Sequence, residues 1–514
     1  MNNKQVLKAI EELLAYAQQK LSLDALDAIY ARNAILAELD LQEPEEPTTK
    51  YTIPKEKMIE PIIQYACNVL KKFEDTPNNR IQFEAKLFGF VTPSPSNVAA
   101  KFDQIAANDC IEKATNYLFD LSKNNNYVRM VDIEKNIQWS FDDPLGTIKI
   151  TINLSKPEKD PKEILAAKNA PDVSYPKCAL CKENLGFPGN AKKAARQTIR
   201  LIKIPLNNEE WYLQYSPYQY YEKHLIALSG QHSNMKVDSN TFIRLLDFVD
   251  LFPHFFIGSN AALPIVGGSI LSHDHYQGGA KVLPMMSATP KFSYTSKKYE
   301  DVTFSIVDWY NSVIRITGKN RKSVLAACNL VNNEWQKYSN NSINILAFTD
   351  DTPHNAVTPV FRKEDDLYVV DLILRNNRCD ETHPYGIFHP IEKLHNIKKE
   401  GIGIIEVMGL FILPGRLKNE IEEMKKLILG EIPFSMEELS KEENPLNKHL
   451  NMILELGNKA KGKVSQKECD NLIYGYINNA CKEILLTTGV FKQDDVGEKA
   501  FNDFMINNLK LVKE

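Results

Sequence analysis

The sequence has little histidine, little cysteine and almost no net charge. Its 514 residues include 10 histidines and 8 cysteines, and the formal net charge is -4. A charge this small creates no global basic field, so we expect neither nucleic acid nor an anionic membrane surface as the main partner. Any bound phosphate must therefore be held by a local cluster of residues.

Long apolar runs are also missing. The best candidate, 255–271, is interrupted by Asn260, Pro264 and two glycines, whereas a membrane span needs about 20 consecutive apolar residues. The first residues have the spacing of an amphipathic helix with mixed charge, without the apolar core of a signal peptide. We therefore expect no membrane association and a cytoplasmic protein, in which cysteines stay reduced.

The composition is that of an ordinary globular protein, with 43% hydrophobic and 25% charged residues. A chain of this length is too long for one hydrophobic core, so we expect two or more domains. The sequence contains no short repeat and no low-complexity tract.

Hydrophobic periodicity divides the chain into helical and strand-rich segments. Residues 147–154 alternate as a strand does, and β-branched stretches recur at 198–205, 211–217, 223–229 and 254–259. A helix capped by Asp238 interrupts them, and another helix is expected over 321–338. This order predicts an α+β fold. The expected segments are a helical region 1–140, a mixed catalytic domain 141–335, a second strand-rich block 336–415 and a helical region 416–514.

The first chemical signal is a pair of histidines two residues apart. His273 and His275 lie in a segment that runs from Gly267 to Gly279 and has two glycines at each end. In an extended segment this spacing places both imidazoles on one face, and the glycines let a phosphate approach the backbone. The structural alternative is that one histidine satisfies a buried hydrogen bond and the other is solvated.

The second signal is a C-x-x-C pair, Cys178 and Cys181. This spacing lets two thiolates bind one tetrahedral metal. A redox pair and a chance occurrence are the alternatives.

The segment 256–279 resembles the active-site stretch of the galactose-1-phosphate uridylyltransferases. It is most similar to the longer bacterial class II branch of that family, which is related to the histidine-triad proteins. Further segments with the same resemblance occur in the family's order at 153–161, 178–184, 386–390 and 405–409. The resemblance implies that the two strand-rich blocks are histidine-triad-like mixed sheet and helix blocks, with helical regions added at both ends.

The resemblance implies that His275 is a nucleophile, because a neutral imidazole nitrogen attacks phosphorus well. Gln277 stands where histidine-triad hydrolases carry a third histidine. Its amide can donate a hydrogen bond to a phosphoryl oxygen, and it activates water poorly. The alternative for Gln277 is a solvent-facing turn residue. The resemblance also implies a structural zinc site formed by Cys178, Cys181, His232 and His273.

Substrate-binding residues are predicted in three places. Lys156 and Lys159 lie where shorter relatives use two arginines near the substrate phosphates, and a solvated surface loop is the alternative. By their position relative to the histidine pair, Asn260 and Ser269 are candidates for hydrogen bonds to the uridine or its phosphates. In the second block, the resemblance implies that Glu406, a carboxylate in an apolar run, binds hexose hydroxyls. Lys399 is a neighbouring candidate.

Two structural alternatives stay open in that second block. The carboxylate of Glu406 needs a polar partner, which an internal salt bridge would also supply. His383, His389 and His395 could suggest a second metal, but Ile391 and Asn396 stand where the family carries further histidines. We therefore assign no role to these three histidines.

The predicted reaction converts UDP-glucose and α-D-galactose 1-phosphate to α-D-glucose 1-phosphate and UDP-galactose through a uridylyl-histidine. Its partners are a UDP-hexose and a hexose 1-phosphate, and the resemblance implies a homodimer. One alternative is a histidine-triad nucleotide hydrolase or phosphorylase that uses the same histidine. The other is a zinc-stabilised binding module without enzymatic activity.

Overall fold

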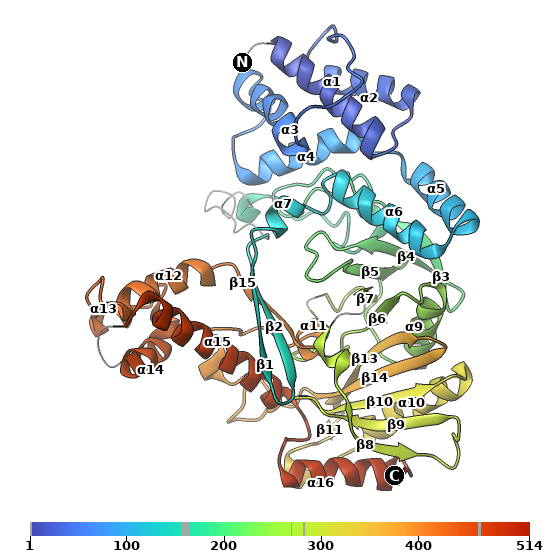
Figure 1. The fold of residues 1–514 in the computed structure, drawn as a ribbon, viewed down its shortest axis with the longest axis vertical. Helices are drawn as coiled ribbons and strands as arrows, with labels where there is room; N and C mark the ends of the chain where they lie inside the picture. The colour runs from blue at the N-terminus through green and yellow to red at the C-terminus, as the bar shows by residue number, and fades with distance from the viewer. Residues whose placement is uncertain (1–2, 156–164, 166, 269, 281–282, 461–463) are drawn as a thin grey trace. The chain divides into compact units, whose positions relative to one another are not determined.

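The computed structural model of the chain (Figure 1) describes residues 3–155, 165, 167–268, 270–280, 283–460 and 464–514. Contacts divide the chain into two compact units. The first comprises Met1–Glu134 and Pro157–Ser233, and the second comprises Lys135–Lys156 and Asn234–Glu514. Each unit therefore combines two separate stretches of the chain.

The first unit begins with helices. Thr76 and Ser94 cap α4 and α5 by accepting hydrogen bonds from backbone N–H groups, and each helix has a proline in its first turn. The proline-containing segment 93–95 thus marks the start of a new helix. The helices are α1 (Asn3–Lys20), α2 (Ala25–Glu38), α3 (Lys55–Gln64), α4 (Pro77–Val91), α5 (Pro95–Asn108), α6 (Ile111–Asn124) and α7 (Met130–Ile133).

Three antiparallel strands of the first unit follow, β3 (Ile202–Leu206), β4 (Glu209–Tyr215) and β5 (Leu225–Ser229). Helix α6 packs against them through aromatic contacts. The ring centroids of Phe119 and Tyr215 lie 4.8 Å apart, and the Tyr215 hydroxyl donates a hydrogen bond of 2.9 Å to the backbone oxygen of Thr115. These buried contacts attach the helical region to the strands.

The second unit contains a large antiparallel sheet (Figure 1). Asp371 is fully buried in it between the guanidinium groups of Arg315 and Arg362, each 2.6 Å away. In spatial order, the strands that this unit contributes to the large sheet are β16 (Val512–Lys513), β8 (Pro290–Thr295), β9 (Val302–Val307), β10 (Val313–Gly318), β14 (Leu367–Asn376), β13 (Asn355–Glu364), β6 (Phe255–Gly258) and β7 (His275–Ala280).

Helices α9 (Ser239–Leu251) and α10 (Arg321–Lys337) pack against this sheet and against each other. The Asp238 side chain accepts a hydrogen bond of 3.1 Å from the backbone N–H of Thr241, and thereby caps α9 as predicted. The apolar stripe of α9 is fully buried at Phe242, Leu245, Leu246 and Val249. This packing fixes one face of β13 and of β6, the strand that pairs with β7.

A smaller sheet in the second unit joins β1 (Ile137–Asp143), β2 (Gly146–Asn153) and β15 (Leu410–Pro414), with β2 and β15 parallel. The Trp139 indole N–H donates a hydrogen bond of 2.8 Å to the Asn478 side chain, which links β1 to α15. The remaining elements of this unit are α11 (Ile404–Val407), α12 (Leu417–Ile428), α13 (Met436–Leu439), α14 (Leu450–Ala460), α15 (Gln466–Thr488), α16 (Asp495–Asp503), β11 (Phe348–Thr349) and β12 (Thr352–Pro353).

Helices and mixed sheets together confirm the predicted α+β class. The helix expected over 321–338 is α10, and the alternating run 147–154 is β2. Among the described residues, no helix has the length and apolar character that crossing a membrane requires.

Candidate active site

Strand β7 presents His275 and Gln277 on one face. On the other face, the Arg244 guanidinium of α9 lies 3.6 Å from an oxygen of Asp274 and donates a hydrogen bond of 3.3 Å to the Tyr276 hydroxyl. Successive residues of a strand point to opposite faces. His275 and Gln277 therefore face away from α9.

The His275 side chain is held in one tautomer. Its Nδ1 lies 2.8 Å from the backbone oxygen of His273. A carbonyl oxygen only accepts hydrogen bonds, so Nδ1 carries the hydrogen and Nε2 carries the lone pair. Burial lowers the pKa of His275 to about 4, so the imidazole is neutral at pH 7. The hydrogen bond of Nδ1 does not use the lone pair on Nε2. A nucleophilic histidine needs this neutral form of the imidazole.

Asn260 connects the end of β6 to the start of α11. Its buried side-chain oxygen accepts a hydrogen bond of 2.8 Å from the backbone N–H of Ile404. Glycines surround its amide, because a Cβ at Gly268 would lie 2.6 Å from the Asn260 side-chain nitrogen and one at Gly403 would lie 3.0 Å from its oxygen. Asn260 therefore contacts the segment that carries Glu406.

Glu406 is nearly buried and forms an internal ion pair. One of its oxygens lies 3.0 Å from the Lys398 Nζ, and the other accepts a hydrogen bond of 3.1 Å from the backbone N–H of Gly403. Burial acts to lower the pKa of Lys398, but the Glu406 carboxylate outweighs it and the pKa is raised. The predicted neighbour Lys399 is exposed, with its Nζ 5.7 Å from the centroid of the Tyr385 ring.

Two charged residues near Glu406, Lys398 and Arg375, were not predicted from the sequence. Lys398 and Lys399 are adjacent, and no pattern indicates which of them is buried. Arg375, at the end of β14, is 1% exposed and donates a hydrogen bond of 2.7 Å to the backbone oxygen of Ile402. Burial lowers the pKa of Arg375 to about 10. The available signal for Arg375 was a cation directly after the strand-like segment 367–374.

Of the three histidines of the second block, His389 and His395 lie near each other, with ring centroids 6.2 Å apart. His383 is exposed, and its Nδ1 lies 2.8 Å from an oxygen of Asp380. His389 is buried, which lowers its pKa to about 4, whereas the Nε2 of His395 lies 2.9 Å from the backbone oxygen of Pro390. They are not part of the one group in the described residues that is placed to share a metal ion.

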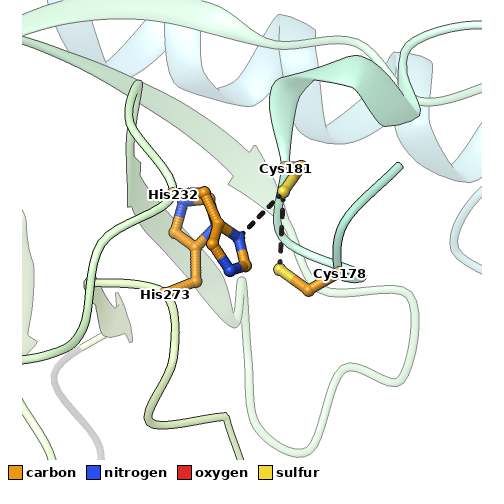
Figure 2. Close-up of side chains that lie close together, drawn as sticks. All are labelled: Cys178, Cys181, His232 and His273. Carbon is orange, nitrogen blue, oxygen red and sulfur yellow. Dashed lines mark hydrogen bonds between the residues drawn. The ribbon is translucent and has the colours of Figure 1, made fainter. Parts of the chain in front are cut away.

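That group is formed by the residues predicted to bind zinc (Figure 2). The sulfur atoms of Cys178 and Cys181 lie 3.6 Å apart, and the Cys181 sulfur lies 3.2 Å from the Nδ1 of His232. The ligand atoms of these three residues and of His273 all lie within 4.8 Å of one another. Two thiols and two imidazoles are a common donor set of structural zinc sites.

The redox alternative for Cys178 and Cys181 fits less well. Both cysteines carry thiols and not a disulfide, and burial raises the pKa of the Cys181 thiol, whereas reactive redox thiols have lowered pKa values. The Asn184 amide donates hydrogen bonds of 2.8 Å to the backbone oxygens of both cysteines and so fixes the turn between them. No role was predicted for Asn184, although its place three residues after Cys181 was a signal for a supporting residue.

Three further predicted residues, Lys156, Lys159 and Ser269, lie outside the residues that the structure describes.

Known proteins match this chain over most of its length. The model of the galactose-1-phosphate uridyl transferase N-terminal domain matches residues 22–234, and that of the C-terminal domain matches residues 248–443. Galactose-1-phosphate uridylyltransferase of Caldanaerobacter subterraneus is 44% identical, covering 98% of each chain. The enzymes of that name from Bacillus subtilis and Fusobacterium nucleatum are 42% and 40% identical, covering 97% and 98% of each chain. The yeast Ap4A phosphorylase Apa2 matches with a TM-score of 0.30 and 10% identity over 64% of this chain and 89% of its own, too weakly to support an argument.

Proposed function

The chain belongs to the galactose-1-phosphate uridylyltransferase family, and from this premise we propose its reaction and the residues that perform it. The enzyme transfers a uridylyl group from UDP-glucose to α-D-galactose 1-phosphate, and so forms α-D-glucose 1-phosphate and UDP-galactose. The observation that carries the proposal is the hydrogen bond between His275 and the backbone of His273, because it leaves the lone pair on Nε2.

In the first half-reaction, Nε2 of His275 attacks the α-phosphorus of UDP-glucose. A P–N bond forms while the bond from the α-phosphorus to the bridging oxygen breaks, and glucose 1-phosphate leaves with the electron pair. In the second, a phosphate oxygen of galactose 1-phosphate attacks the same phosphorus and the P–N bond breaks. The proton on Nδ1 stays in its hydrogen bond throughout, so the imidazole returns neutral.

Gln277 supports this chemistry as a hydrogen-bond donor. Its side chain shares a strand face with His275, where an amide N–H can donate to a non-bridging oxygen as negative charge collects there. A sugar phosphate leaves as a stable anion and needs no general acid. An amide is also a poor base toward water, so the uridylyl-histidine is protected from hydrolysis.

Binding of the sugar and phosphates falls to the remaining predicted residues. Glu406 accepts hydrogen bonds from hexose hydroxyls, since its pairing with Lys398 and Gly403 leaves lone pairs on both oxygens. Asn260 contributes through its amide nitrogen, because its oxygen is bonded to Ile404. Lys156 and Lys159 are assigned to the substrate phosphates and Ser269 to the uridine or its phosphates. Lys399 is assigned to the hexose, beside Glu406.

Zinc would be held by Cys178, Cys181, His232 and His273, a donor set that suits it. A metal with four protein ligands has no open position for substrate, so its contribution is to fix the backbone. His273 would then have two roles, since its side chain would be a ligand and its backbone oxygen orients His275. We also propose a cytoplasmic homodimer, which cell fractionation and light scattering of the purified protein would test.

Isotope exchange tests the proposed reaction. Labelled glucose 1-phosphate should enter UDP-glucose in the absence of galactose 1-phosphate, because the first half-reaction is reversible on its own. A hydrolase would instead release UMP from UDP-glucose at a rate that matches or exceeds exchange. A binding module without activity would show neither reaction, and either result would contradict the transferase.

A further inference from the structure

Arg375 is a fully buried cation whose hydrogen-bonding capacity is mostly unused. The side chain is 1% exposed, and one Nη2–H donates to the backbone oxygen of Ile402 at 2.7 Å. Nε and Nη1 have no hydrogen-bond partner among the residues that the structure describes. A guanidinium has five N–H donors and stays charged at neutral pH, so such burial without partners is costly.

No carboxylate forms an ion pair with Arg375 in the described parts of the chain. Glu406 acts on it electrostatically, but the Glu406 oxygens contact the Nζ of Lys398 and the backbone N–H of Gly403. Lys398 therefore already balances the charge of Glu406. The buried group formed by Arg375, Lys398 and Glu406 has a net charge of about one positive unit.

A chain of contacts within the second unit connects Arg375 to the strand that carries His275. Arg375 bonds to Ile402, and Ile404 bonds to Asn260 at the end of β6. The Ile404 side chain lies against Gly258, where a Cβ would come within 2.5 Å of it. Gly258 is the register partner of Gln277 on β7. These contacts thus connect Arg375 to β6, the strand that pairs with the strand of the reacting histidine.

We propose that Arg375 binds the phosphate group attached to the hexose, in hexose 1-phosphate and in UDP-hexose. This inference rests on the proposed transferase function and names a binding residue beyond those assigned to it. The substrate phosphate supplies both the missing negative charge and the acceptors for Nε and Nη1. Arginine is suited to this role because its hydrogen bonds to phosphate are charge-assisted.

Such a contact also favours the chemical step. As the bond to the α-phosphorus breaks, negative charge builds up on the hexose phosphate that leaves. A fixed guanidinium in a buried site therefore stabilises the transition state, in which this charge develops, more than it stabilises the ground state. Arg375 therefore contributes to both substrate affinity and the rate of His275 uridylylation.

Steady-state kinetics of Arg375→Met test the proposal. The KM for galactose 1-phosphate should rise about 10–100-fold, as expected when a hydrogen bond to a charged group is lost. Inhibition by UMP should stay within about twofold of wild type, because UMP lacks the hexose phosphate. Arg375→Lys, which keeps the charge, should restore part of the loss. Arg378→Met is the matched control, since Arg378 lies three residues away and its guanidinium donates a hydrogen bond to the backbone oxygen of Asn344, and it should leave all values unchanged.

Two outcomes would overturn the role of Arg375. One is an unchanged KM for galactose 1-phosphate in folded Arg375→Met, and the other is an equal loss of galactose 1-phosphate and UMP binding, which indicates a structural role. If the variant does not fold, a wild-type crystal structure with galactose 1-phosphate decides instead. A phosphate oxygen should lie within about 3.2 Å of Nε or Nη1, and a phosphate beyond that reach contradicts the proposal. Absence of exchange in the wild type would refute the transferase itself, whereas calorimetric binding of galactose 1-phosphate would still test Arg375.

Discussion

The cysteine and histidine cluster and the region around β7 and α11 use polar side chains in opposite ways. In the cluster, the donor atoms of Cys178, Cys181 and His232 face one another and converge on one point (Figure 2). Around β7, the hydrogen bond of His275 uses Nδ1 and not Nε2, and Arg375 keeps unbonded N–H groups among the described residues. Donor atoms that converge on one another suit a structural metal, whereas atoms left available suit a substrate. The following predictions test this contrast.

The largest effect is expected from His275→Asn. The variant keeps a polar side chain but has no nucleophilic nitrogen, so exchange of label between glucose 1-phosphate and UDP-glucose should fall by about 10^4-fold or more. Its melting temperature should stay near the wild-type value. Exchange at more than a few per cent of the wild-type rate would remove His275 from its role.

The next effect is expected from Gln277→Ala. Loss of a hydrogen bond to developing negative charge typically lowers kcat by about 10^2–10^3-fold. Gln277→Glu replaces the donor with an acceptor and should be at least as slow. Rapid-quench measurement of His275 uridylylation checks this, and a variant that changes only KM would contradict the proposed role.

The adjacent lysines offer a matched pair for stability. Lys398→Met leaves the Glu406 carboxylate buried without its partner and should lower the free energy of unfolding by about 3 kcal/mol. Lys399→Met removes an exposed cation and should change it by less than about 0.5 kcal/mol. Urea denaturation of both variants tests the difference, and equal losses would show that the ion pair with Glu406 is not important.

A smaller effect on turnover is expected from the metal site. Cys181→Ser removes one thiolate ligand and should lower zinc content and melting temperature, while kcat of the folded fraction stays within about tenfold of wild type. Metal analysis and calorimetry give the two readouts. Complete loss of turnover in a folded, zinc-loaded variant would assign this site a direct catalytic role.

The smallest effect concerns pH. Burial, with His395 and Arg375 nearby, lowers the pKa of His389 from 6.5 to about 4. In the unfolded chain this imidazole takes up a proton below about pH 6.5, whereas in the folded protein it stays neutral down to about pH 4. The folded state is therefore not penalised by this histidine above about pH 6.5, and it loses stability relative to the unfolded chain as the pH falls towards about 4. His389→Gln should therefore lose about 2–4 °C less than wild type between pH 7.5 and 5. The exposed His383→Gln is the control and should follow the wild type.

Much of the fold was predictable because hydrophobic periodicity reports local structure directly. The stripe of α9, its Asp238 cap and the start of α10 all follow from patterns of neighbouring residues. The bond between Asn260 and Ile404 joins positions 144 residues apart, and no local pattern indicates it. For the same reason the sequence did not distinguish Lys398 from Lys399.

The candidate site shows the same limit. The spacing of Cys178 and Cys181 indicated that two sulfur atoms lie close in space, because they are close in sequence, and a metal site was one of the interpretations that it allowed. The unbonded N–H groups of Arg375 depend on what surrounds the end of β14, which only the folded chain defines. Sequence patterns therefore indicated residues with distinctive chemistry, such as paired cysteines. They did not indicate Arg375, whose charge lacks a partner only because of how the chain folds around it.

The central claim, that Nε2 of His275 forms a bond to phosphorus, has one direct measurement. The enzyme is incubated with UDP-glucose labelled in the uridine, denatured at alkaline pH, digested and analysed by mass spectrometry. Close to one uridylyl group per active site should be found on the peptide that contains His275, and galactose 1-phosphate added before denaturation should remove it. Rapid exchange without any labelled peptide, or a label on another residue, would contradict the account.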